Sequence, residues 1–262
     1  MPQTGAANAP ITENESVKEL LAILDAHHSA SKKDFLAVIN QVGAMERQLD
    51  AAVKELAGMR RELAEAQKNN HPVVNAMRNA VAVMQEQVTE LRKQLAVLKQ
   101  TVIDGCKNAV TAFKEKGISA LSNITRFFKI KPILEAVHTT AHRAAMSADQ
   151  AIAKIEAVSA EYHEAGRHLK NMGRAMTGKE AIQEARPPGA VAKTVSAPFR
   201  AVRACFAGIR NQAVGAVNNL KRLEAQAQRK PSIKKTMQRY NEKIEREGRA
   251  APDRPRPAKA ER

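Results

Sequence analysis

Aromatic side chains are scarce in this sequence of 262 residues, which has no tryptophan, two tyrosines and six phenylalanines, or 3% of the chain. β-Sandwiches and β-barrels are built from strands rich in aromatic and β-branched residues, so this composition argues against both. Two cysteines are too few for a disulfide scaffold or a four-cysteine zinc site. A wholly disordered chain is also excluded, because 44% of the residues are apolar.

Long hydrophobic runs are absent as well. No segment approaches the roughly 18 consecutive apolar residues of a membrane-spanning helix. Residues Met1–Pro10 lack the basic start and the apolar stretch of a secretory signal peptide. We therefore expect a cytoplasmic protein in which Cys106 and Cys205 are reduced thiols, the alternative being a disulfide between them.

The chain is rich instead in strong helix formers such as alanine, leucine, glutamate, lysine, glutamine and arginine. With few aromatics to fill a thick core, they favour an elongated helical protein. Proline lacks the backbone N–H and clashes with the preceding helical turn, so each internal proline predicts a helix boundary. These prolines are Pro72, Pro132, Pro187, Pro188, Pro198 and Pro231.

Apolar residues between positions 31 and 116 recur at alternating spacings of three and four, which is the pattern of a heptad repeat. Two heptad helices joined by a short turn around Pro72 should fold back on each other. We predict an antiparallel coiled-coil hairpin, and the pattern leaves open whether its seams pair within one chain or between two. The first seam is Phe35, Val38, Val42, Met45, Leu49, Ala52, Leu56, Met59, Leu63 and Ala66, and the second is Val74, Met77, Val81, Met84, Val88, Leu91, Leu95, Leu98 and Val102.

The predicted fold class is thus all-α and elongated, with disordered tails. Thr12 and Glu15 have the spacing of a capping box and predict the start of a first short helix. A long helix is expected from Pro132 to about Met176. The predicted segments are a disordered N-terminus (1–11), a short helix (12–30), the hairpin (31–116), a short helix and the long helix (117–186), a Pro-rich linker (187–197), basic helices (198–247) and a disordered basic tail (248–262).

Charge is distributed very unevenly. The chain has 43 Lys and Arg against 27 Asp and Glu, a net charge of +16. Residues 1–100 hold 12 basic and 12 acidic side chains, whereas residues 101–262 hold 31 and 15. Between Ala165 and Tyr240 the ratio is 16 to 3. This asymmetry indicates a polyanionic partner, although a plain solvated face is the alternative.

Nucleic acid is the commonest partner of this kind, because lysine and arginine neutralise phosphates and release counterions. The sequence has no zinc finger and no aromatic platform for single strands, so contact with the backbone and weak sequence selectivity are expected. The candidate nucleic-acid-binding residues are Arg167, Lys170, Arg174, Lys179, Arg200, Arg203, Arg210, Lys221, Arg222, Arg229, Lys230, Lys234, Lys235 and Arg239.

An acidic protein and an anionic membrane surface are the alternative partners. The segment Val195–Leu223 is basic and amphipathic, with Phe199 and Phe206 on its apolar side, as in helices that lie on membranes. Ile118–Leu134 has a similar character. Because aromatics are so few, we expect them to be buried in a helical bundle.

Three patterns resemble catalytic or metal-binding signatures but are incomplete. Gly173 and Gly178 have the spacing of a phosphate-binding loop, yet Glu180 stands where a magnesium-binding Ser or Thr belongs and a helix precedes the segment. Glu135 and His138 match one half of a di-iron site, and no second half exists. The cysteines lie in apolar contexts. We therefore expect no enzyme, no cofactor, no metal and no small-molecule substrate.

Five segments carry a resemblance to a known family: Ile39–Glu46, Gly105–Val110, Ala112–Leu121, Lys154–His168 and Lys230–Lys235. They resemble an uncharacterised bacterial family of helical, coiled-coil-containing proteins that are encoded on conjugative or integrative mobile elements. The resemblance extends over most of the chain, from about Val17 to Glu247. It implies a bacterial cytoplasmic setting and a role near DNA transfer, and it implies no catalytic residues.

Together these features predict a non-catalytic accessory or scaffold protein. In this hypothesis the neutral hairpin associates with other proteins or with itself, and the basic second half contacts nucleic acid without sequence specificity. The alternatives are a purely structural helical protein that binds an acidic partner, and a peripheral membrane binder.

Overall fold

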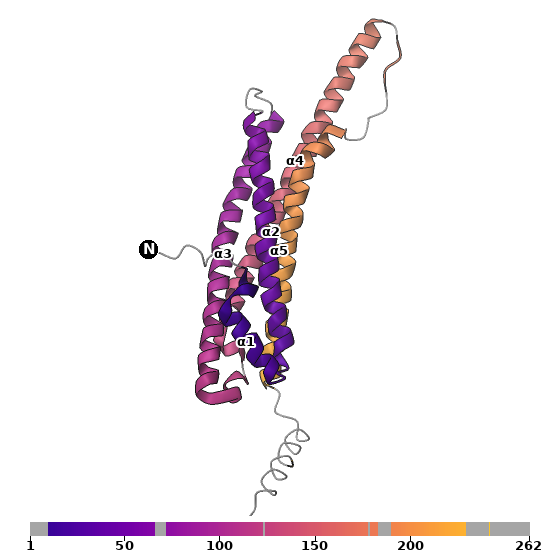
Figure 1. Ribbon diagram of the computed structural model, residues 1–262. Helices are drawn as coiled ribbons and strands as arrows, with labels where there is room; N and C mark the ends of the chain where they lie inside the picture. The colour runs from indigo at the N-terminus through magenta and orange to yellow at the C-terminus, as the bar shows by residue number, and fades with distance from the viewer. Residues whose placement is uncertain are drawn as a thin grey trace, which may run out of the picture.

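The computed structural model describes residues 10–65, 72–122, 124–177, 179–182 and 190–228, together with residue 241. These residues form α-helices, short 3₁₀-helices and their connections, without a strand among them. The all-α, elongated fold class predicted from the sequence is therefore confirmed (Figure 1).

Four long helices form the body of the molecule: α2 (Ser31–Glu65), α3 (Pro72–Lys116), α4 (Lys131–Met176) and α5 (Ala190–Gln228). They are arranged as a ring in which α2 lies beside α3, α3 beside α4, α4 beside α5, and α5 again beside α2 (Figure 1). Neighbours run antiparallel. Helix α5 packs most extensively, against both α2 and α4, whereas α2 and α3 touch each other least. The architecture is an up-down-up-down four-helix bundle.

Shorter elements pack around the lower half of the bundle (Figure 1). They are η1 (Ile11–Glu13), α1 (Glu15–Ala26), η3 (Gly117–Leu121) and η4 (Ile124–Phe127). Helix α1 lies mainly against α3, and its Leu20 and Leu24 are fully buried (Figure 1). The region 117–130 is thus two 3₁₀-helices and not the single short helix that we predicted. Gly117 ends α3 with a positive φ of 64°, a conformation that glycine adopts without strain.

The start of α1 also differs from the prediction. The N-cap is Asn14, whose side chain accepts a hydrogen bond from the Ser16 N–H at 3.1 Å, while Thr12 lies in η1. Asparagine is at least as favourable as threonine at an N-cap position. The helix therefore begins after Asn14, two residues later than we predicted from Thr12. Ile11, which was assigned to a disordered N-terminus, is fully buried.

The predicted heptad seams form the core. Every position of the first seam from Phe35 to Leu63 is buried, as are the positions from Val81 to Val102 of the second, while Ala66 lies outside the described residues. These seams belong to one hydrophobic cluster with residues of α4 and α5. The two arms are therefore half of a four-helix bundle, and not a separate two-helix coiled coil. If α2 and α3 formed a coiled coil alone, the faces that α4 and α5 cover would be exposed to water.

Helix α5 begins eight residues before the predicted boundary at Pro198, within the segment that we assigned to a linker. The proline lies inside the helix and removes one hydrogen bond from the ladder. Burial of Phe199, Val202 and Phe206 directly after it compensates, since all three side chains are completely inaccessible. The part of the predicted basic helices after residue 228 and the predicted tail at 248–262 fall outside the residues that the structure describes, apart from residue 241.

Polar contacts between helices repeat every seven residues. Gln87 donates to the Ser147 hydroxyl at 2.9 Å, and Gln94 donates to the Thr140 hydroxyl at 3.1 Å, linking α3 to α4. This spacing matches the heptad period, so the same face of each helix meets its neighbour over a long distance. A shift by a residue or two would separate these pairs, which specifies the alignment of the two helices.

Helix α4 extends well beyond its neighbours. Its 46 residues correspond to about 70 Å. Arg200 of α5 pairs with Glu156 of α4, so Ala190 at the antiparallel start of α5 lies at about the level of residue 166. Figure 1 shows α4 running past the upper ends of α2 and α3. We name the last three turns of α4, Ala165–Met176, the α4 overhang.

Candidate nucleic-acid interface

Two of the candidate arginines on α5 are engaged in ion pairs across the bundle. The guanidinium of Arg200 lies 2.6 Å from the Glu156 carboxylate, and Arg203 pairs with Asp149. Both carboxylates belong to α4. The positive charge that the sequence shows at these positions is therefore matched locally, and these arginines attach α5 to α4.

Arg222 plays a similar part at the other end of α5. Its Nε donates to Asp34 at 3.0 Å, and Gln226 donates to the second oxygen of the same carboxylate at 2.8 Å. Asn219 accepts from Arg222 and donates to Gln41 at 2.8 Å. The Asp34 side chain is only 11% exposed. This polar network joins α5 to the first turns of α2.

The other predicted residues of the C-terminal region fall into two groups. Lys221 is exposed, and Arg210 donates a hydrogen bond to its neighbour Asn211 at 3.4 Å. The remaining five candidates, which are Arg229, Lys230, Lys234, Lys235 and Arg239, lie outside the described residues.

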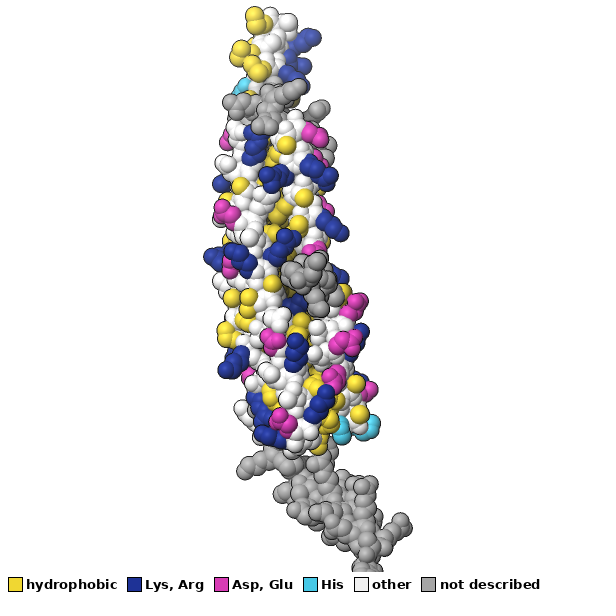
Figure 2. Space-filling model, turned by 60° about the vertical axis from the view of Figure 1, so that its left-hand side comes forward, with side chains coloured by type: hydrophobic (Ala, Val, Ile, Leu, Met, Phe, Trp, Pro, Cys, Tyr) yellow, Lys and Arg dark blue, Asp and Glu magenta, His cyan; other side chains and the backbone are white. Residues whose placement is uncertain are grey.

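The α4 overhang carries basic and apolar side chains on opposite faces. Arg167, Lys170 and Arg174 follow one another at intervals of three and four and so share one face of the helix. Leu169, Met172 and Met176 share the other face, where they are 67%, 63% and 88% exposed. Figure 2 shows this separation at the upper end of the molecule, with hydrophobic side chains on one side and Lys and Arg on the other.

The chain folds back along the basic face after α4 ends. The Asn171 side chain donates to the Ile182 carbonyl at 3.1 Å and accepts from the Ile182 N–H at 2.8 Å. Arg174 donates through Nε to the Glu180 carbonyl at 2.7 Å. These bonds place Lys179 next to the overhang. Four of the fourteen predicted residues, Arg167, Lys170, Arg174 and Lys179, are therefore brought together at one end of the rod.

The charges of this basic face are only partly matched. Arg167 pairs with Glu164, which also lies 3.3 Å from His168. Lys170 and Lys179 are exposed and form no ion pair among the residues described. The two lysines are thus the side chains of this group most available to an external anion.

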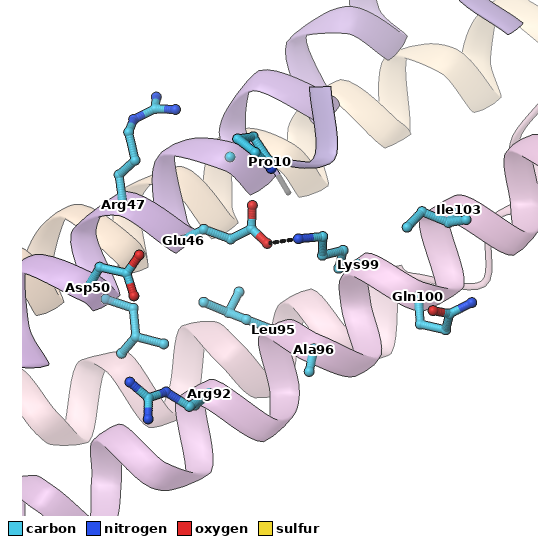
Figure 3. A pocket seen from close by; sticks show the side chains of 12 residues that line it. Pro10, Glu46, Arg47, Asp50, Arg92, Leu95, Ala96, Lys99, Gln100 and Ile103 are labelled. Carbon is cyan, nitrogen blue, oxygen red and sulfur yellow. Dashed lines mark ion pairs between the residues drawn. The ribbon is translucent and has the colours of Figure 1, made fainter. Parts of the chain in front are cut away.

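The structure also has a groove between α2 and α3 that we did not predict from the sequence. It has a volume of about 710 Å³, and a further hollow of about 540 Å³ lies beside it, with Arg92 lining both. Leu95 is on the floor, and Glu46 and Lys99 face each other across the groove at 3.0 Å (Figure 3). The balanced charge count of residues 1–100 conceals this site, because the count does not show which residues gather.

Four arginines line this groove and the hollow beside it. They form no ion pair within the described part of the chain. Below the groove, α1 occupies the region between α2 and α3, where Glu19 pairs with Lys114 at 2.9 Å. The four residues are Arg47, Arg60, Arg61 and Arg92.

Both cysteines are free thiols, as predicted. Their environments differ. Cys106 is fully buried in α3, and burial raises the pKa of its thiol to about 12. Cys205 on α5 is half-buried, and its pKa is raised by burial and by the nearby carboxylate of Glu55. Neither environment favours a thiolate, which is the reactive form of cysteine.

Glu135 and His138, which were singled out in the sequence, lie within α4, whereas Gly178 falls outside the described residues and Glu180 follows the helix. Gly173 lies within α4 and not in a loop. The rings of His138 and His142 stack with centroids 6.5 Å apart. The described residues contain no group of three or more metal-ligating side chains.

The aromatic side chains that suggested a membrane surface are buried. Phe199 and Phe206 are inaccessible, Phe128 is 6% exposed, and Phe127 is half-buried against the same core. The expectation that these side chains fill a bundle is confirmed. Among the helices of the described ranges, none combines the length and the hydropathy needed to cross a bilayer.

Comparisons with known proteins gave one match. Residues 13–262 match a family of unknown function, DUF6674. No curated protein and no solved structure matches the chain.

Proposed function

We propose that this chain, which belongs to the DUF6674 family, is a non-catalytic helical scaffold that contacts the phosphate backbone of nucleic acid. The observation that carries the proposal is the α4 overhang. There Arg167, Lys170, Arg174 and Lys179 gather on one side of a helix that stands clear of the bundle. Exposed cations on an accessible helix are what binding to phosphates requires.

The remainder of the bundle serves as a rigid support in this proposal. Arg200, Arg203 and Arg222 hold α5 in place, so they contribute to stability more than to binding. The heptad seams are buried within the chain, and association with other proteins would use other surfaces. The resemblance to proteins of mobile elements adds the proposal that the bound nucleic acid is the DNA of a conjugative or integrative element.

A salt titration of DNA binding by fluorescence anisotropy tests the proposal. The variant Lys170→Gln/Lys179→Gln removes the two exposed lysine charges of this basic face in the full-length chain. Each lost phosphate contact lowers the log–log slope by about 0.9, so the slope should fall by about 1.8 if both residues bind phosphate.

The matched control is Lys93→Gln/Lys107→Gln, which removes the same charge from exposed positions of α3. It should leave the slope unchanged. Equal effects of the two double variants would indicate attraction to net charge alone and would contradict a defined binding face. No binding at low salt would refute the proposal itself.

The five candidate residues beyond the described ranges need a separate variant. Substitution of all five by glutamine, at Arg229, Lys230, Lys234, Lys235 and Arg239, measures their share of the salt slope. If the whole slope is lost here and none with the lysines of the overhang, the nucleic-acid contact lies after α5 and the overhang has another role.

A second candidate function is binding of an acidic helical protein segment in the groove between α2 and α3. The observation that favours it is α1, an amphipathic helix that already occupies the lower part of this region and pairs Glu19 with Lys114. Arg60 and Arg92 line the unoccupied part. An apolar floor with basic residues around it suits an acidic amphipathic helix.

A fluorescent acidic amphipathic peptide is the probe for this second function. The variant Arg60→Gln/Arg92→Gln should weaken its binding several-fold, whereas Lys93→Gln/Lys107→Gln should not. If both pairs weaken binding equally, the attraction is unspecific and the groove is not the site.

A further inference from the structure

The apolar seam of α4 does not stop where the bundle ends. Inside the bundle it runs through Ala148, Ala151 and Ile155, which are at most 5% exposed. With the same alternation of three and four it continues through positions 158 and 162. It then reaches the α4 overhang, where its last four members are Ala165, Leu169, Met172 and Met176.

Nothing in the described part of the chain covers the end of this seam. The segment 179–182 is bonded to Asn171 and Arg174, which lie on the basic side of the helix. Leu169, Met172 and Met176 remain 67%, 63% and 88% exposed. An apolar seam stabilises a helix only when another surface covers it and removes it from water. The exposed end of this seam is therefore suited to packing against a second helix.

We propose that the overhang pairs with the overhang of a second copy of this chain, antiparallel and about a two-fold axis, so that two bundles join end to end. The order of the side chains is self-complementary. With the axis between residues 169 and 172, Leu169 of one copy meets Met172 of the other, and Ala165 meets Met176. Each contact then occurs twice, as a two-fold interface requires.

The residues beside the seam also permit close approach of two identical helices. Gly166 and Gly173 lie along one edge, and a Cβ at either position would meet nothing within 4 Å. His168 and Ala175 lie along the other edge. No lysine or arginine flanks the seam, because Arg167, Lys170 and Arg174 are on the opposite face. The like charges of two copies therefore point away from the contact.

This charge arrangement favours a second copy even though the protein is strongly basic. The basic faces of a pair are separated by the two helices, each about 10 Å across. That separation exceeds the screening length of roughly 8 Å at physiological ionic strength. The paired overhangs would still present their basic faces to phosphates, so the contact is compatible with the proposed function and independent of it.

The proposed contact between the two overhangs is small, so we expect the dimer to be weak. One seam of four positions per copy falls among the weak, transient interfaces of less than about 1,200 Å² in total. We therefore expect a reversible dimer that forms with rising protein concentration. Since the attraction is apolar, it should persist at high salt.

Sedimentation equilibrium of the full-length chain across the micromolar range tests the proposal. The wild-type weight-average mass should rise toward twice the monomer mass, at low and at high salt alike. Leu169→Glu/Met172→Glu should remain monomeric with an unchanged thermal unfolding curve, because both side chains are exposed. A dimer that persists in this variant overturns the proposal.

Val97→Glu is the matched control, since Val97 on α3 is 55% exposed and lies away from the overhang. It should dimerise like the wild type. A wild-type chain that stays monomeric throughout also overturns the proposal. If it then co-sediments with phosphatidylserine-containing vesicles and Leu169→Glu/Met172→Glu does not, a membrane surface is the occupant of this seam.

Discussion

At the scale of single residues, Gly105 of α3 is packed directly against the backbone of Phe127 and the ring of Phe128. A Cβ at this position would lie 2.7 Å from the Phe127 carbonyl oxygen and would overlap the ring of Phe128. We predict that Gly105→Ala lowers the free energy of unfolding by about 1–3 kcal/mol, as for other overpacked cores. Urea denaturation followed by circular dichroism measures the change.

Gly58 of α2 is the control for this prediction, because a Cβ there would meet nothing within 4 Å. Gly58→Ala should stabilise the chain by up to about 1 kcal/mol through helix propensity alone. Effects of the same sign in the two variants would contradict the steric explanation for Gly105.

The two thiols should differ in reactivity. Cys106 is fully buried and its pKa is raised to about 12, while Cys205 is half-buried. We predict that maleimide modifies Cys205 first in the native protein and Cys106 only after unfolding, since both access and thiolate formation are suppressed at Cys106. Mass spectrometry of timed samples shows the order, and equal rates would contradict it.

The same shift makes stability depend on pH. Burial raises the pKa of the Cys106 thiol from its ordinary value of 9.0 to about 12, so the fold favours the protonated form. The resulting contribution to stability is complete below pH 9 and is lost as the pH rises from 9 toward 12. Cys106→Ala should show a shallower loss of stability over this interval than the wild type, as measured by urea denaturation at a series of pH values.

At the scale of helices, the ion pairs of α5 should differ in importance. Asp34 accepts hydrogen bonds from Arg222 and Gln226 and is 11% exposed, whereas Asp149 pairs with Arg203 at 44% exposure. We predict a cost of about 2 kcal/mol for Asp34→Ala. Asp149→Ala should cost less than about 1 kcal/mol. Chemical denaturation of both variants is the measurement, and a larger cost at Asp149 would contradict the ranking.

Helix positions were largely readable from the sequence, because a heptad pattern depends only on neighbouring residues. The seams from Phe35 and from Val81 are buried as predicted. Pro198 was misread as a boundary, since burial of Phe199 and Phe206 outweighs one missing hydrogen bond. Local patterns do not reveal that kind of long-range compensation.

The candidate site was predictable only in part, for a related reason. A count of charges locates the basic second half of the chain, but it does not show that Asp149 and Asp34 neutralise arginines 54 and 188 residues away. What distinguishes Lys170 and Lys179 from the arginines of α5 is the length of α4 beyond its neighbours. That property depends on how four helices are aligned.

At the scale of the whole molecule, each helix is stabilised by two neighbours. An isolated fragment 31–116 would keep the α2–α3 contact, which is the least extensive of the ring, and lose the faces that α4 and α5 cover. We predict that this fragment is helical only when it self-associates. In such a dimer, a second hairpin would take the place of α4 and α5. Its melting temperature should therefore rise with concentration, and a concentration-independent melt of a helical monomer would contradict this.

The ring of helices has no structural beginning or end. Because α5 lies beside α2, with Arg222 against Asp34, the last long helix already touches the first. The order in which the chain visits the four helices is therefore one of several that give the same neighbours. A circular permutant that is cut between α2 and α3 and has a linker from α5 back to α1 keeps every pairing of the bundle.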